Sequence, residues 1–100
     1  MRLSEEQVKV IINAVTSHFD NRAHIYLFGS RLNDQLRGGD IDLFIDLPDV
    51  DYDLVRHTCQ AIAEIQMALG EQKIDLIVRH PRSPDQAIFH EVLSQGMLLH

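Results

Sequence analysis

Apolar residues recur at helical spacing in two long segments, residues 5–19 and 54–69. Stripes of this kind place one helix face in a core. Ser4 and Gln7 form a capping box in front of the first segment, and Gly70 follows the second as a C-cap. We therefore expect two amphipathic helices that pack on the rest of the domain.

Three shorter segments have the pattern of strands. Residues 23–28 and 73–78 are rich in β-branched and aromatic side chains, and residues 40–46 alternate apolar and polar positions with period two. The link between the first two strands, residues 29–39, is too short for a full crossover helix. These two strands are therefore expected to be antiparallel, in a mixed sheet.

The end of the chain predicts one more helix. Ser83 is the expected N-cap, Pro84 the first helical position and Gly96 the end. The apolar tail, residues 97–100, either docks on the domain as a short extended segment or forms part of a surface for another chain.

These elements define the fold class. With a possible helical turn at residues 31–35, the order is α-β-(α)-β-α-β-α, an α/β (α+β) fold in which helices cover a small mixed sheet. One hundred residues are enough for one domain with its own core, and we expect a single domain over residues 1–100.

Charge and cysteine content narrow the functional classes. The net charge is −6 and the nine Lys and Arg residues form no cluster, which argues against nucleic acid as a partner. The lone Cys59 excludes an internal disulfide. No apolar run approaches the roughly 18 residues of a membrane span, and the N-terminus lacks an apolar signal core. We expect a cytoplasmic protein without a membrane partner.

Three carboxylates are candidate metal ligands. Asp40 and Asp42 share one side of a strand, about 6.6 to 6.8 Å apart, so both can reach one hard cation or a close pair of cations. Asp75 is the only acid in another strand. A buried acid is unfavourable unless it is paired or bound to metal. Together these residues predict a Mg²⁺ site of the two-metal type.

A phosphate site is expected beside these carboxylates. Gly29 and Ser30 follow the first strand, where glycine permits close backbone approach and serine adds a hydroxyl beside backbone N–H groups. Arg31 is the candidate cation for the phosphates. Lys73 shares the parity of Asp75, although a solvated position is the simpler interpretation. Metal and phosphate on neighbouring strand ends suggest a nucleotide.

Other acids and histidines have a structural interpretation. Asp49, Asp51 and Asp53 precede the second long helix and are expected to be exposed acids that complement its dipole. His57 and Cys59 lie two residues apart, on different helix faces, and form no zinc pattern.

The site motif resembles that of a known family. Gly29-Ser30, nine residues, Asp40-x-Asp42 and a later strand with Asp75 are similar to the minimal nucleotidyltransferase (MNT) domain of the polymerase-β-type superfamily. The resemblance extends from the first helix to about Val78. It implies a nucleotidyltransferase fold, ATP or another nucleoside triphosphate as substrate, and Mg²⁺ as cofactor. It also implies a HEPN-family toxin as partner, with this chain as the antitoxin.

Three functional hypotheses follow. The first is an enzyme that moves AMP, or another nucleoside monophosphate, to a hydroxyl on a partner protein, because a chain this short leaves little material for a second wall around an acceptor. The second is a non-catalytic antitoxin or binding module with a vestigial nucleotide site. The third is a transferase for a small molecule such as an aminoglycoside. Three converging carboxylates favour an enzyme, since their repulsion destabilises the metal-free fold.

Overall fold

Helices are interspersed with the strands of one sheet along the chain. The structure is a computed structural model that describes residues 3–29, 41–70 and 72–100. Its elements are, in order, α1 (Glu5–His18), β1 (His24–Phe28), β2 (Ile41–Asp46), α2 (Leu54–Leu69), β3 (Ile74–Arg79), α3 (Ala87–Gln95) and β4 (Met97–Leu98). This order confirms the predicted fold class and adds one short strand at the end. The possible turn at residues 31–35 lies outside the described residues. Among those that are described, no helix is long and apolar enough to cross a membrane.

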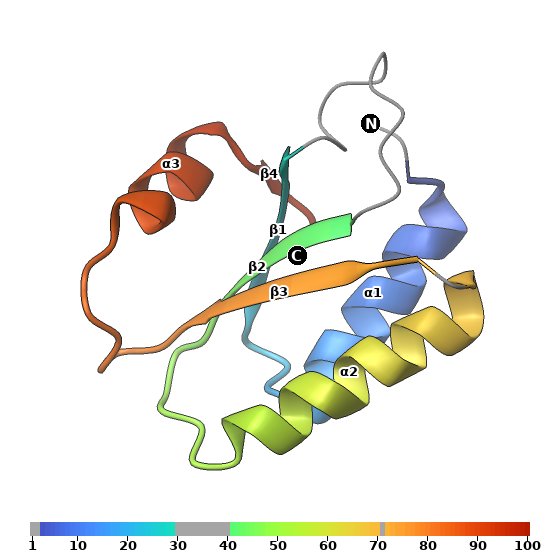
Figure 1. Cartoon of the computed structure of the whole chain (residues 1–100), viewed down its shortest axis with the longest axis horizontal. Coiled ribbons are helices and arrows are strands. Elements are labelled where there is room, and N and C mark those ends of the chain that lie inside the picture. Colours follow the sequence, from blue (N-terminus) through green and yellow to red (C-terminus); the bar gives the residue numbers. More distant parts are fainter. Residues whose placement is uncertain (1–2, 30–40, 71) are drawn as a thin grey trace.

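The sheet is mixed, as predicted, with strand order β3-β2-β1-β4 (Figure 1). β1 is antiparallel to β2, and β2 is parallel to β3. The apolar tail forms β4 on the open edge of β1, where Leu27 faces Met97 and the Leu99 amide donates to the Ile25 carbonyl at 2.6 Å. The first of the two alternatives for the tail is therefore correct.

One face of the sheet forms the main core. Its inward side chains come from alternate strand positions and pack against α1 and α2, the two neighbouring helices on the right and at the bottom of Figure 1. On this face, the fully buried strand side chains are Ile25 and Leu27 of β1 and Ile41, Leu43 and Ile45 of β2. This core aligns the three long strands and so sets the positions of the side chains on their other face.

The opposite face, which we call the α3 face, carries the polar residues. Three rows of side chains cross it in register: Phe28, Asp42 and Asp75; then Tyr26, Phe44 and Ile77; then His24, Asp46 and Arg79. From α3, Phe89 and Val92 cover the middle row by packing on Phe44. Polar groups therefore remain at both ends of this face.

Three of the predicted helix ends are confirmed and one is wrong. The Ser4 hydroxyl accepts from the Gln7 amide at 3.2 Å, Gly70 ends α2 with φ +93°, and Gly96 ends α3. However, α3 begins at Ala87 and is not capped by Ser83. The Ser83 hydroxyl instead accepts from the His80 amide at 3.0 Å, so the turn after β3 uses the group that the sequence suggested as a cap.

The loop before α2 contains an acid that is less exposed than expected. Asp49 and Asp53 are exposed, but the Asp51 side chain is only 13% exposed and lies 2.6 Å from Nδ1 of His57. Burial raises the pKa of Asp51, yet the hydrogen bonds from His57 and from the Asp53 amide outweigh burial, and the pKa falls below its ordinary value of 3.8. Asp51 thus joins the loop to the first turns of α2.

We expect Asp51→Asn to lower the free energy of unfolding by about 1 to 2 kcal/mol at neutral pH, because the charged hydrogen bond to His57 is lost. Since the folded-state pKa of Asp51 is depressed, its contribution is present above pH 3.8 and is lost as the pH falls through the lower folded value. Thermal melts at neutral pH and well below pH 3.8 measure this. Asp53→Asn, at an exposed ion pair with Arg56, is the control and should change little. An Asp51→Asn deficit that is the same at both pH values would contradict the assignment.

Candidate active site

Three of the predicted site residues meet at one end of the α3 face. Gly29 directly follows β1, while Asp42 and Asp75 are each the second residue of a strand. Asp42 and Asp75 face each other in the parallel pair of β2 and β3, and adjacent strands lie about 4.8 Å apart. Both side chains are partly buried. The sheet therefore presents two neighbouring carboxylates on the same surface.

Gly29 lies directly against one of these carboxylates. Its φ is +77°, in the left-handed region that favours glycine. A Cβ atom at this position would lie 2.3 Å from Oδ2 of Asp42, far inside van der Waals contact. The absence of a side chain at Gly29 therefore creates the space in which the Asp42 carboxylate sits.

We expect Gly29→Ala to damage the site more than the fold. An L-residue at this φ is disfavoured by about 1 to 3 kcal/mol, and the new methyl group must displace the Asp42 carboxylate. Because a displacement of about 1 Å can reduce a rate by about a hundredfold, the rate of the nucleotidyl transfer that the resemblance implies should fall by that order. Thermal melts and single-turnover kinetics separate the two effects. Gly70→Ala is the control, since Gly70 also has positive φ but has open space around its Cβ position. Full activity in folded Gly29→Ala would show that the contact does not matter.

The carboxylates of Asp42 and Asp75 suit a divalent cation. Carboxylate oxygens are the ligands that Mg²⁺ prefers, and two carboxylates in register repel each other unless a positive charge lies between or beside them. Among the residues that the structure describes, no three acids, histidines or cysteines are grouped closely enough to hold a metal. Asp40, the third predicted ligand, lies outside the described residues, as do Ser30 and Arg31. Asp42 and Asp75 are thus the described part of the predicted metal site.

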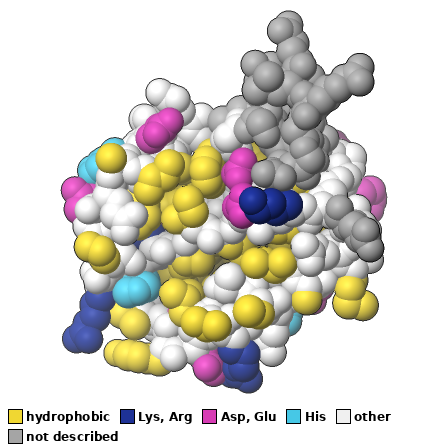
Figure 2. Space-filling view, viewed as in Figure 1, with side chains coloured by type: hydrophobic (Ala, Val, Ile, Leu, Met, Phe, Trp, Pro, Cys, Tyr) yellow, Lys and Arg dark blue, Asp and Glu magenta, His cyan; other side chains and the backbone are white. Residues whose placement is uncertain are grey.

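One face of the molecule combines acidic, basic and hydrophobic side chains. Figure 2 shows acidic side chains near the centre of this view, next to a Lys or Arg side chain and beside a patch of hydrophobic side chains. Lys73, just before β3, is exposed and its carbonyl accepts from the Ile41 amide at 2.9 Å. The simpler interpretation of Lys73, a solvated residue at a strand start, agrees with this exposure.

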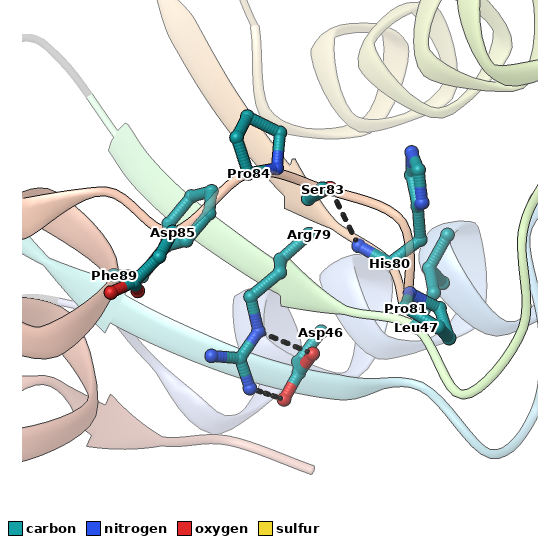
Figure 3. A pocket seen from close by; sticks show the side chains of 9 residues that line it. All are labelled: Asp46, Leu47, Arg79, His80, Pro81, Ser83, Pro84, Asp85 and Phe89. Carbon is teal, nitrogen blue, oxygen red and sulfur yellow. Dashed lines mark hydrogen bonds and ion pairs between the residues drawn. The ribbon is translucent and has the colours of Figure 1, made fainter.

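An ion pair at the opposite end of the α3 face was not predicted from the sequence. Arg79 donates to Asp46 through two nitrogens, at 3.0 and 2.7 Å (Figure 3). The guanidinium carbon also lies 5.9 Å from the ring centroids of Phe44 and Phe89. The hydrogen bonds that Arg79 donates to Asp46 raise the pKa of Arg79. The pair lines a cavity of about 370 Å³.

The register of β2 and β3 explains why polar side chains meet at both ends of the α3 face. Asp46 faces Arg79 in the same ladder in which Asp42 faces Asp75. The bidentate pair therefore stabilises the alignment that brings the two site carboxylates together. The shared outward parity of Asp46 and Arg79 was a signal in the sequence, but the register that joins them was not.

Comparison with known proteins agrees with this architecture. None of the curated proteins compared with the chain matches it. A family model described as "Polymerase beta, Nucleotidyltransferase" matches residues 9–100, a range that includes the sheet, all the described site residues and the predicted ones between them. The chain therefore belongs to the polymerase beta nucleotidyltransferase family, whose members transfer nucleoside monophosphates.

Proposed function

We propose that this chain transfers AMP, or another nucleoside monophosphate, from a nucleoside triphosphate to a hydroxyl group of a partner protein. The observation that carries the proposal is the juxtaposition of Gly29, Asp42 and Asp75 at one end of the α3 face. The rigid sheet aligns the two carboxylates, and the backbone of Gly29, which has no side chain, lies against Asp42. This arrangement suits a metal-bound triphosphate. Like charges on neighbouring strands repel each other, and a bound cation would relieve that repulsion.

Each site residue has a role in this proposal. Asp42 and Asp75, together with Asp40, would hold Mg²⁺. When bound, the cation would offset the charge of the triphosphate and lower the pKa of the attacking hydroxyl. Asp75 would accept the proton of that hydroxyl as its oxygen attacks the α-phosphorus and pyrophosphate leaves. Ser30 and Arg31 are proposed to bind the leaving phosphates, and Gly29 allows the triphosphate to approach the backbone.

A protein acceptor is favoured over a nucleic acid. The net charge of −6 and the carboxylates at the site repel a polyanionic acceptor. The resemblance to minimal nucleotidyltransferases implies a HEPN-family toxin, which this chain would neutralise by attaching AMP to it. We therefore propose that the chain is the antitoxin of such a pair and that modification, rather than coverage of the toxin surface, is the neutralising act.

The test is a transfer assay with intact-mass readout. The purified chain, MgCl₂ and ATP are incubated with a HEPN-family toxin from the same organism as the candidate acceptor, and GTP, CTP and UTP replace ATP in parallel reactions. The proposal predicts that the HEPN-family protein gains the mass of one nucleoside monophosphate and that toxicity is lost with it. Tight binding without any mass gain, together with undiminished protection by the Asp42→Asn/Asp75→Asn double variant, would overturn the enzymatic proposal in favour of a non-catalytic antitoxin.

A further inference from the structure

A groove of about 230 Å³ opens between the end of β1 and α3. Phe28, Ile88 and Val92 supply its apolar walls, and Glu91 and Gln95 supply polar groups from α3. On α3, these positions fall on one helix face, because residues three, four and seven apart lie above one another. The groove is therefore apolar inside, with two hydrogen-bonding side chains along one wall.

The groove is continuous with the carboxylate end of the α3 face. Gly29 lines the groove and also lies against the Asp42 carboxylate. Phe28, which forms the wall on the β1 side, faces Asp42 directly in the ladder of β1 and β2. A molecule that has its phosphates at the carboxylates can therefore place its other end in this groove.

The chemistry of the walls suits an aromatic base. The Phe28 ring is partly exposed and offers a stacking surface for a base, while Ile88 and Val92 provide apolar contact on the α3 side. Glu91 and Gln95 are exposed, and their side chains make no hydrogen bond with another described residue. A carboxylate accepts from an exocyclic amino group, and a carboxamide can donate to the ring nitrogen or carbonyl beside it.

We propose that this groove binds the nucleotide base and selects a purine with an exocyclic amino group, which Glu91 and Gln95 recognise. The inference rests on the proposed function and names the substrate class of the same site. Apolar walls on both sides favour the larger ring system of a purine. A base without the amino group leaves the Glu91 carboxylate without a donor, and this lowers its affinity.

Calorimetric titration tests the inference with no acceptor present. ATP, GTP, ITP, UTP and inorganic tripolyphosphate are titrated with MgCl₂ into the full chain and into Glu91→Ala and Gln95→Ala. Of ATP and GTP, we expect the one with the higher affinity to bind at least about tenfold more tightly than ITP, UTP or tripolyphosphate. In each variant, the affinity for that purine nucleotide should fall about tenfold, and the affinity for tripolyphosphate should stay unchanged. Gln60→Ala, the same change on an exposed position of α2, is the control and should bind as the parent chain does.

The outcomes separate this inference from the proposed function. If all four nucleotides bind as tightly as tripolyphosphate, or if purine preference survives in both variants, the groove does not read the base and the inference is wrong, while the phosphate site stands. If neither tripolyphosphate nor any nucleotide binds, the proposed function fails and the inference fails with it. Thermal melts of each variant confirm that the fold is retained.

Discussion

Asp42→Asn is expected to reduce nucleotidyl transfer by about a thousandfold while the protein stays folded. The substitution keeps the shape of the side chain but removes the negative charge that, with Asp75, would hold the metal. Loss of a group that stabilises developing charge typically reduces a rate by a factor of about 10² to 10³, or roughly 3 to 4 kcal/mol in the barrier. Asp42 sits in register with Asp75 and against Gly29, so no other described carboxylate can take its place. The measurement is single-turnover transfer at saturating MgCl₂ and nucleotide.

Thermal melts of Asp42→Asn provide the control for folding. Without metal, the variant should remain folded, because asparagine keeps the shape of the side chain and removes a charge that repels Asp75. With MgCl₂ and a non-hydrolysable ATP analogue at about one hundred times its Kd, the parent gains about 2.7 kcal/mol and the variant gains little. Asp49→Asn, at an exposed ion pair with Arg22, should retain both transfer and the ligand-induced shift. A folded Asp42→Asn protein that transfers at the parent rate would exclude the proposed role.

Phe44→Ala is expected to lower the free energy of unfolding by about 3 to 5 kcal/mol, the usual range for removing a buried phenyl ring. Phe44 is fully buried, and its ring centroid lies 5.9 Å from that of Tyr26 and 5.5 Å from that of Phe89. It is the centre of the contact that holds α3 on the sheet. At about 4 to 8 °C per kcal/mol for a domain of this size, the melting temperature should fall by more than about 12 °C.

A second substitution shows whether the loss comes from burial. Tyr52→Ala also removes an aromatic ring, but this ring is 87% exposed, so the melting temperature should stay within a few degrees of the parent value. Denaturant titration at one temperature gives the free energies directly. If Phe44→Ala lowers stability by less than about 1 kcal/mol, α3 does not pack on Phe44 as described, and the groove that it forms with β1 would also be in doubt.

The local pattern of apolar and polar residues was sufficient to predict most of the fold. The spacing of apolar residues identified α1 and α2, because a helix that packs on a sheet must carry a stripe with the helical period. The alternation at residues 41–46 placed Asp42 and Asp46 on one face of β2, because successive strand residues point to opposite sides. The short link after β1 excluded a crossover and correctly predicted an antiparallel pair. The fold class and the identities of the candidate site residues followed from these local rules.

Such local rules could not predict the contacts between segments that are distant in the sequence. Parity places Asp75 and Arg79 on one side of β3, but only pairing with β2 shows that they face Asp42 and Asp46. Ser83 satisfies every local requirement of an N-cap, yet its hydroxyl binds the His80 amide. Asp51 resembles an ordinary exposed acid until its contact with His57 is seen. The groove beside Gly29 joins β1 to α3, which lie about 60 residues apart in the chain. The amino-acid order therefore specifies which side chains are available and on which face, because both depend on backbone period. Strand register and helix docking determine which of those side chains meet, because both depend on how the whole core packs.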